Sequence, residues 1–167
     1  GASKVRLASM TSPDNIKDVH AYGIEIQSEL FFALTHKSKV RLNGTYSYTP
    51  SINQGEPISE ADLSIGKQLP YVPKHSAAIT GSIAWKTWSF LYKWCYYSER
   101  FTMSSNDISL TGKLPLYFMS NITLEKIFNI PSMEISLKGT INNLFNEEYL
   151  SVLARPMPRI NGELFIG

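Results

Sequence analysis

The sequence has little cysteine, little charge and no long apolar run, and each shortage excludes a class of protein. Its 167 residues include one cysteine, Cys95, which excludes an intrachain disulfide and a metal site built from several cysteines. No uncharged apolar run reaches the about 18 residues that mark a transmembrane helix. A net charge of +2 gives no reason to expect nucleic acid as a partner. This composition still allows a membrane β-barrel, whose strands alternate apolar and polar residues.

Apolar and polar residues alternate along most of the chain, which predicts β-strands with one apolar and one polar face. The clear segments are residues 22–34, 40–49, 76–86, 88–99, 116–128 and 133–142. Weaker segments at 4–10 and 159–167 bring the expected number of strands to eight. Over the six clear segments the 34 positions of the apolar stripes hold one charge, Lys126, and the 34 opposite positions hold nine.

The connections between these segments are short and long in strict alternation. Short turns are expected at residues 35–39, at 87 and at 129–132, and long connections at 11–21, 50–75, 101–115 and 143–158. Greek-key sandwiches place long loops at both ends, whereas up-and-down outer-membrane barrels have short periplasmic turns at one rim and long extracellular loops at the other. We therefore predict an all-β, antiparallel, up-and-down transmembrane barrel architecture, with both chain ends on the periplasmic side.

The direction of the apolar stripe separates this barrel from a soluble ligand-binding β-barrel, in which apolar residues point inward. One strand carries five large aromatic residues on a single face, namely Trp88, Phe90, Tyr92, Trp94 and Tyr96. Five such side chains would overfill a narrow interior, but they suit a lipid-facing wall with aromatic girdles. Lys126 lies near the expected turn at 129–132, where its side chain can reach the membrane interface. At mid-membrane the same residue would cost about 2–4 kcal/mol.

The last third of the chain contains a recognisable motif. Residues 140–149 read Thr-Ile-Asn-Asn-Leu-Phe-Asn-Glu-Glu-Tyr, and residues 155–160 read Arg-Pro-Met-Pro-Arg-Ile. This Asn-Leu-Phe-Asn-x-x-Tyr segment, followed by a loop and a Pro/Arg-led final strand, resembles the end of TonB-dependent outer-membrane receptors. Three further segments are similar to that family and occur in its order: 21–26, 44–49 and the Pro-x-x-Pro-x-His lead at 69–75.

The resemblance implies a barrel of about 22 strands plugged by a globular domain, in the cell outer membrane. Residues 1–167 have room for eight strands and no plug, so we interpret them as the C-terminal barrel segment of such a receptor. Two alternatives stay open at this point. Either the rest of the receptor accompanies the segment, or the eight strands close as a small barrel with a structural or adhesive role.

The implied function is import of a scarce ligand such as a ferric siderophore, haem, cobalamin or a glycan. The implied partners are outer-membrane lipid, the plug domain of the same receptor, TonB acting through the plug, and the small-molecule or iron-chelate ligand. The longest connection, 50–75, is the best candidate for ligand contact. Its candidate residues are Asn53, Gln54, Glu56, Glu60 and Tyr71.

Catalytic and metal-binding signatures are missing from the sequence. The three histidines, His20, His36 and His75, show no metal-ligand spacing on a common element. Neither a nucleophile elbow nor a Gly-rich phosphate loop is present. We therefore expect no enzyme activity, no cofactor and no metal site.

Overall fold

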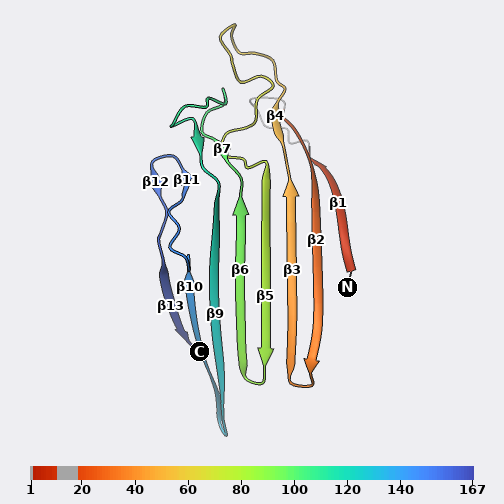
Figure 1. Cartoon of the computed structure of the whole chain (residues 1–167), viewed down its shortest axis with the longest axis vertical. Helices are drawn as coiled ribbons and strands as arrows, with labels where there is room; N and C mark the ends of the chain where they lie inside the picture. Colours follow the sequence, from red (N-terminus) through yellow and green to blue (C-terminus); the bar gives the residue numbers. More distant parts are fainter. Residues whose placement is uncertain (1, 11–18) are drawn as a thin grey trace.

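A computed structural model describes residues 2–10 and 19–167, whose eight long strands form one antiparallel sheet (Figure 1). The long strands are β1 (Ala2–Met10), β2 (Val19–Thr35), β3 (Ser38–Tyr48), β5 (His75–Trp85), β6 (Trp88–Tyr97), β9 (Tyr117–Ile130), β10 (Met133–Asn142) and β13 (Asn161–Ile166). The all-β, antiparallel architecture is as predicted. Within the described residues, no helix is long and apolar enough to cross a membrane.

The strands follow one another across the sheet in chain order, from β1 at one edge to β13 at the other. Every neighbouring pair is antiparallel, which is the up-and-down connectivity that the alternating loop lengths predict. Among the described residues nothing pairs β1 with β13, and Figure 1 shows the two strands at opposite edges. The sheet is open, so the small closed barrel considered above is not the arrangement observed.

Strand register places the apolar stripes of neighbouring strands directly opposite one another. Leu30 of β2 faces Leu42 of β3, and Phe90 lies between Ile83 of β5 and Leu124 of β9. Because side chains alternate along a strand, these matches extend one apolar face over β2 to β13 and one polar face behind it. We call these the apolar face and the polar face.

The apolar face is uncovered. Many of its large side chains expose more than a third of their surface, among them Ile24, Leu30, Phe32, Ile79, Ile83, Leu124 and Leu137. Among the residues whose burial is described, Leu114 is the one apolar residue that is fully buried. A soluble domain instead buries such residues in a core. The wall therefore requires an apolar surrounding on this side.

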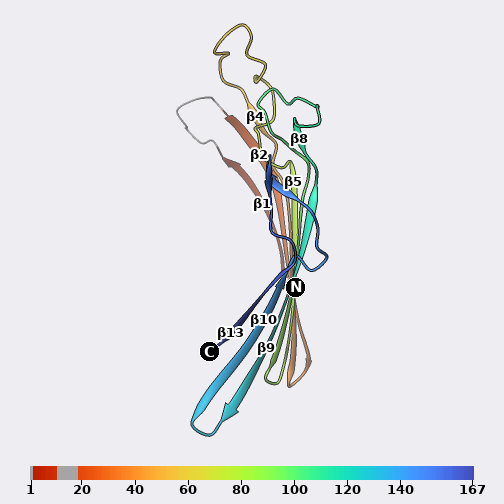
Figure 2. The ribbon, with the colours of Figure 1, turned by 90° about the vertical axis from the view of Figure 1, so that its left-hand side faces the viewer.

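The three long connections that the structure describes lie at one end of the sheet and the two-residue turns at the other (Figure 1). We call these the loop end and the turn end. The turns comprise residues 36–37, 86–87 and 131–132. The first and the last of these turns are shorter than the sequence predicts. Seen from the side, the sheet is strongly twisted, and β9, β10 and β13 swing away from the other strands toward the turn end (Figure 2).

The structure also differs from the sequence prediction in its loops and at several strand ends. Five short strands were not predicted: β4 (Ser51–Asn53), β7 (Arg100–Phe101), β8 (Lys113–Leu114), β11 (Leu150–Val152) and β12 (Arg155–Pro156). Two or three residues are too few to show a periodicity. Strand β2 begins at Val19, inside a predicted connection whose residues 11–18 lie outside the described part of the chain. Strand β9 continues to Ile130, so Lys126 lies further from its turn than predicted.

Candidate functional site

The longest loop, between β3 and β5, is a folded unit. Its strand β4 adds to β2 beyond the end of β3, with Asn53 opposite Val19. Asn53 is 2% exposed, and its side-chain amide is fully engaged inside the loop. Its Nδ2 donates to Ser64 Oγ at 2.9 Å, and its Oδ1 accepts from the Gly55 N–H at 3.2 Å. The geometry therefore gives Asn53 a role in loop folding.

The other four residues of the predicted ligand site are exposed on the same loop. Gln54, Glu56 and Glu60 follow β4 in the chain, and Tyr71 precedes the start of β5 by four residues. Tyr71 has a φ of 62°, in the left-handed region that few non-glycine residues adopt. Its N–H donates to the Phe101 carbonyl at 2.7 Å, which holds this backbone against the next loop. The assignment of these residues to ligand contact stays a prediction.

A reciprocal pair of hydrogen bonds joins this loop to the one between β6 and β9. The Gln68 N–H donates to Asn106 Oδ1 at 2.8 Å, and Asn106 Nδ2 donates back to the Gln68 carbonyl at 2.8 Å. Gln68 is buried, so these groups would be costly to leave unpaired. The two loops therefore form one assembly at the loop end.

Arg100 connects the same assembly to the third long loop. It is 5% exposed, and its Nη2 donates to the carbonyls of Pro115 at 3.2 Å and of Leu150 at 3.0 Å. Its guanidinium lies 4.7 Å from the centre of the Tyr117 ring, a cation–π contact. Burial lowers the pKa of the Arg100 guanidinium below its ordinary value, and the nearby Tyr117 acts in the opposite direction. Sequence reasoning missed Arg100, because its partners are distant along the chain.

Three tyrosines stack beside Arg100. The Tyr117 ring lies 5.2 Å from that of Tyr97 and 4.7 Å from that of Tyr149. Tyr97 and Tyr117 are opposite each other in register. Tyr97 is two residues from Cys95, and Tyr117 is four residues from Asn121. Because Cys95 and Asn121 belong to the polar face and the spacings are even, both tyrosines lie on the polar face. Tyr149 comes from the loop after β10, and burial raises the pKa of its phenol. The stack seats this loop against the polar face at the loop end.

The Asn-Leu-Phe-Asn-x-x-Tyr motif has a structural explanation. Asn143 is 2% exposed with a φ of 51°, and Asn146 has a φ of 55°. Asparagine tolerates this left-handed region better than most residues. Asn143 Oδ1 accepts from the Glu147 N–H at 2.8 Å, its Nδ2 donates to the Glu147 carbonyl at 2.9 Å, and its own N–H donates to Asn121 Oδ1 at 3.0 Å.

Asn146 completes this arrangement. Its N–H donates to the Asn143 carbonyl at 2.8 Å, and its Oδ1 accepts from the Ile160 N–H at 3.1 Å. The two asparagines reverse the chain at the end of β10. Through Ile160, Asn146 also fixes the residue that precedes β13. Tyr149, the last residue of the motif, is the one that stacks on Tyr117.

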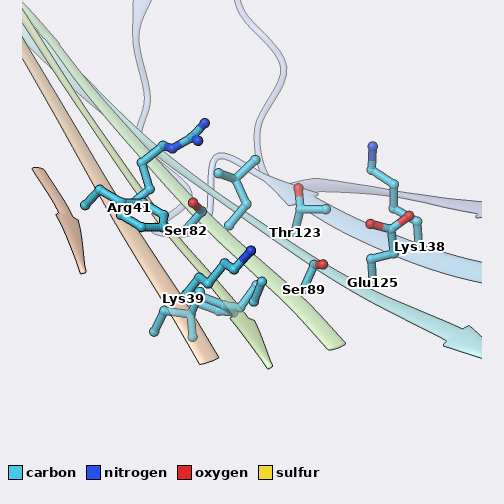
Figure 3. Close-up of a pocket in the computed structure, with 12 residues that line it drawn as sticks. Lys39, Arg41, Ser82, Ser89, Thr123, Glu125 and Lys138 are labelled. Atoms are coloured by element: carbon cyan, nitrogen blue, oxygen red, sulfur yellow. The ribbon is translucent and has the colours of Figure 1, made fainter. Parts of the chain in front are cut away.

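The polar face carries a hollow of about 370 Å³ over β2 to β10 (Figure 3). Its polar lining is Lys39, Arg41, Ser82, Ser89, Thr123, Glu125 and Lys138. Arg41 Nε lies 3.5 Å from Glu29 Oε1, and Glu125 is opposite Lys138 in register. Such a wall suits water or a polar protein surface. The described residues include no group of three or more His, Cys, Asp or Glu side chains that could hold a metal ion.

Comparison with known proteins identifies the family. Residues 2–144 match the family described as TonB dependent receptor-like, beta-barrel. The chain belongs to this family. The resemblance inferred from the Asn-Leu-Phe-Asn-x-x-Tyr motif and its companion segments is thereby confirmed, and TonB-dependent receptors are outer-membrane proteins. No curated protein sequence matches the chain significantly.

Two solved structures share the fold of this receptor barrel. BauA, the ferric preacinetobactin receptor from Acinetobacter baumannii, is 17% identical with a TM-score of 0.66, over 98% of this chain and 26% of BauA. The ferric citrate transporter FecA in its unliganded form is 13% identical with a TM-score of 0.58, over 89% of this chain and 28% of FecA. The chain thus spans about a quarter of the length of either structure.

Proposed function

We propose that residues 1–167 are the C-terminal barrel segment of an outer-membrane TonB-dependent receptor that imports a scarce ligand. The ligand class is a ferric siderophore, haem, cobalamin or a glycan. The proposal rests on one observation. The sheet has an uncovered apolar face and a polar face, and its three described long loops contact one another at the loop end. A wall of this kind separates lipid from a polar interior and presents its loops to the outside.

The open edges of the sheet support the presence of further strands. Strands β1 and β13 each have a row of backbone N–H and C=O groups that face no strand in the described sheet. In lipid every such group must be paired, since each unpaired one costs several kcal/mol. We therefore propose that the remaining strands of the receptor pair with β1 and β13, and that a plug domain packs on the polar face. TonB then acts through the plug, and no covalent chemistry is expected of this segment.

The loop assembly is the proposed ligand-contact surface. Gln54, Glu56, Glu60 and Tyr71 are exposed there and are held in place by buried residues of the same loop, Asn53 and Gln68. A rigid base with exposed polar and aromatic side chains is a suitable recognition surface. Within the candidate set, Asn53 positions the loop and the other four contact the ligand.

Uptake by the whole receptor tests this function. A strain deleted for the receptor gene is complemented with the wild type, and uptake of ferric siderophores, haem, cobalamin and glycans is measured with and without TonB. We expect uptake of one of these ligands that requires both proteins. The matched variants are Tyr71→Ala at the loop end and Glu134→Gln at the turn end.

The expected result is lower uptake for Tyr71→Ala at low ligand concentration and unchanged uptake for Glu134→Gln. Unchanged uptake of all four ligand classes on deletion of the receptor gene would contradict the import function. A receptor that is folded and monodisperse in plain buffer without detergent would contradict the membrane placement itself.

A further inference from the structure

The turn end of the sheet carries a compact group formed by two tryptophans of the apolar face and two lysines that lie against their rings. We call Trp85, Lys86, Trp88 and Lys126 the turn cluster. Trp85 and Trp88 are opposite each other across the turn between β5 and β6. Lys86 Nζ lies 4.8 Å from the centre of the Trp85 ring, and Lys126 Nζ lies 4.7 Å from that of Trp88. Each ammonium group is thus held against an aromatic ring.

Lys126 is positioned by three neighbours. It is opposite Trp88 in register, its Nζ donates to Thr87 Oγ1 at 2.5 Å, and it also lies 5.7 Å from the centre of the Phe128 ring. A lysine ammonium has three N–H donors, of which the Thr87 hydroxyl takes one. Two donors therefore stay available to an acceptor outside the sheet.

Lys86 is a second, independent indication that the turn end carries a functional positive charge. It has a φ of 55°, a backbone conformation for which asparagine or glycine is the less strained choice in a tight hairpin. The turn nevertheless carries a lysine, which adds a positive charge. The Lys86 N–H donates to the Lys37 carbonyl at 3.0 Å, so the neighbouring turn, with its own lysine, lies directly beside it.

In the part of the chain that the structure describes, no carboxylate lies on the apolar face beside these charges. The nearest acidic residues along the strands, Glu125 and Glu134, belong to the polar face by their position in the alternation. The ion pairs found among the described residues engage Arg41, Lys113 and Arg159, not the lysines of the turn cluster. The cluster is therefore a positively charged, aromatic patch that borders the exposed apolar side chains of Ile83 and Leu124.

We propose that the turn cluster binds the phosphodiester of an anionic phospholipid, with the acyl chains of the lipid against the apolar face. This inference rests on the proposed function, which places the apolar face in a membrane. The charges favour an anionic headgroup over a zwitterionic one, whose own cation offsets its phosphate. The tryptophan rings lie at the level where an interfacial aromatic girdle meets headgroups.

The test compares lipids on the whole receptor in detergent micelles. Native mass spectrometry measures how much phosphatidylglycerol and phosphatidylcholine stays bound at equal concentrations. We expect the wild type to retain phosphatidylglycerol preferentially. In the double variant Lys86→Gln/Lys126→Gln, the ratio of bound phosphatidylglycerol to bound phosphatidylcholine should fall about fivefold for each lysine removed.

Two control variants separate charge from folding. Lys93→Gln removes a lysine from the polar face and should retain the lipid preference of the wild type. Lys86→Arg/Lys126→Arg preserves both charges and should also retain it. An equal retention of the two lipids by the wild type, or an unchanged preference in the glutamine double variant, would overturn the inference.

Cell fractionation distinguishes this inference from the function on which it rests. A receptor absent from the outer-membrane fraction would contradict both the proposed function and the lipid site. A receptor found in that fraction that imports its ligand but shows no preference for phosphatidylglycerol would contradict the lipid site alone.

Discussion

Gln68 and Asn106 exchange two hydrogen bonds of 2.8 Å although 38 positions separate them in the chain. This contact joins the two largest loops into one assembly. Asn106 has a φ of 54°, so its backbone suits asparagine or glycine.

Asn106→Gly removes the side chain and keeps the backbone conformation accessible. We expect residues 54–74 to open locally more often, since the buried Gln68 backbone loses its partners at a cost of about 1–3 kcal/mol. Amide hydrogen exchange of the whole receptor measures this as faster exchange in that loop. Leu110→Ala, at a fully exposed position, is the control. Equal exchange rates in the glycine variant and the wild type would show that the loops are independent.

Asn143 offers a graded prediction. Asn143→Gly loses the side-chain hydrogen bonds to Glu147, and Asn143→Ala loses them and also strains the left-handed backbone by about 1–2 kcal/mol. Thermal unfolding of the receptor in detergent should therefore rank the wild type above glycine and glycine above alanine. Identical unfolding midpoints for the two variants would contradict a contribution of backbone strain at position 143.

The two faces of β9 predict opposite responses to charge. Ile122 lies between Tyr92 and Ile141 on the apolar face, and Thr123 is adjacent on the polar face. Ile122→Lys should destabilise the receptor in vesicles by up to about 2–4 kcal/mol, because the ammonium must face lipid. Thr123→Lys should change stability much less. Urea unfolding in vesicles measures both, and a smaller loss for Ile122→Lys than for Thr123→Lys would reverse the assignment of the faces.

Arg100→Lys tests the link between the second and third loops. A lysine retains the charge but cannot present a planar guanidinium to the Tyr117 ring and two carbonyls together. We expect faster proteolysis of the loop around Leu150 in intact cells. Lys113→Arg, a charge-preserving change at a half-buried neighbour, is the matched control. Protease sensitivity equal to that of the wild type would mean that Arg100 does not hold this loop.

Strands and faces were predictable because the alternation is a local property. The stripe from Trp88 to Tyr96 appears in the sequence as in the structure, and Lys126 is the one charge in the apolar stripes at both levels. The short strands and the role of Asn53 were not predictable. Asn53 looks like any polar loop residue until β4 pairs with β2 and buries it.

The sequence by itself determined the all-β class, the strand order and the separation of an apolar from a polar face, since a period of two forces neighbouring side chains to opposite sides. Its motif also pointed to the receptor family. Only the tertiary structure decided that the sheet stays open, which loop residues are buried and where the lysines of the turn cluster lie. Those features depend on contacts such as that of Arg100 with Leu150, 50 positions apart, for which no local pattern exists.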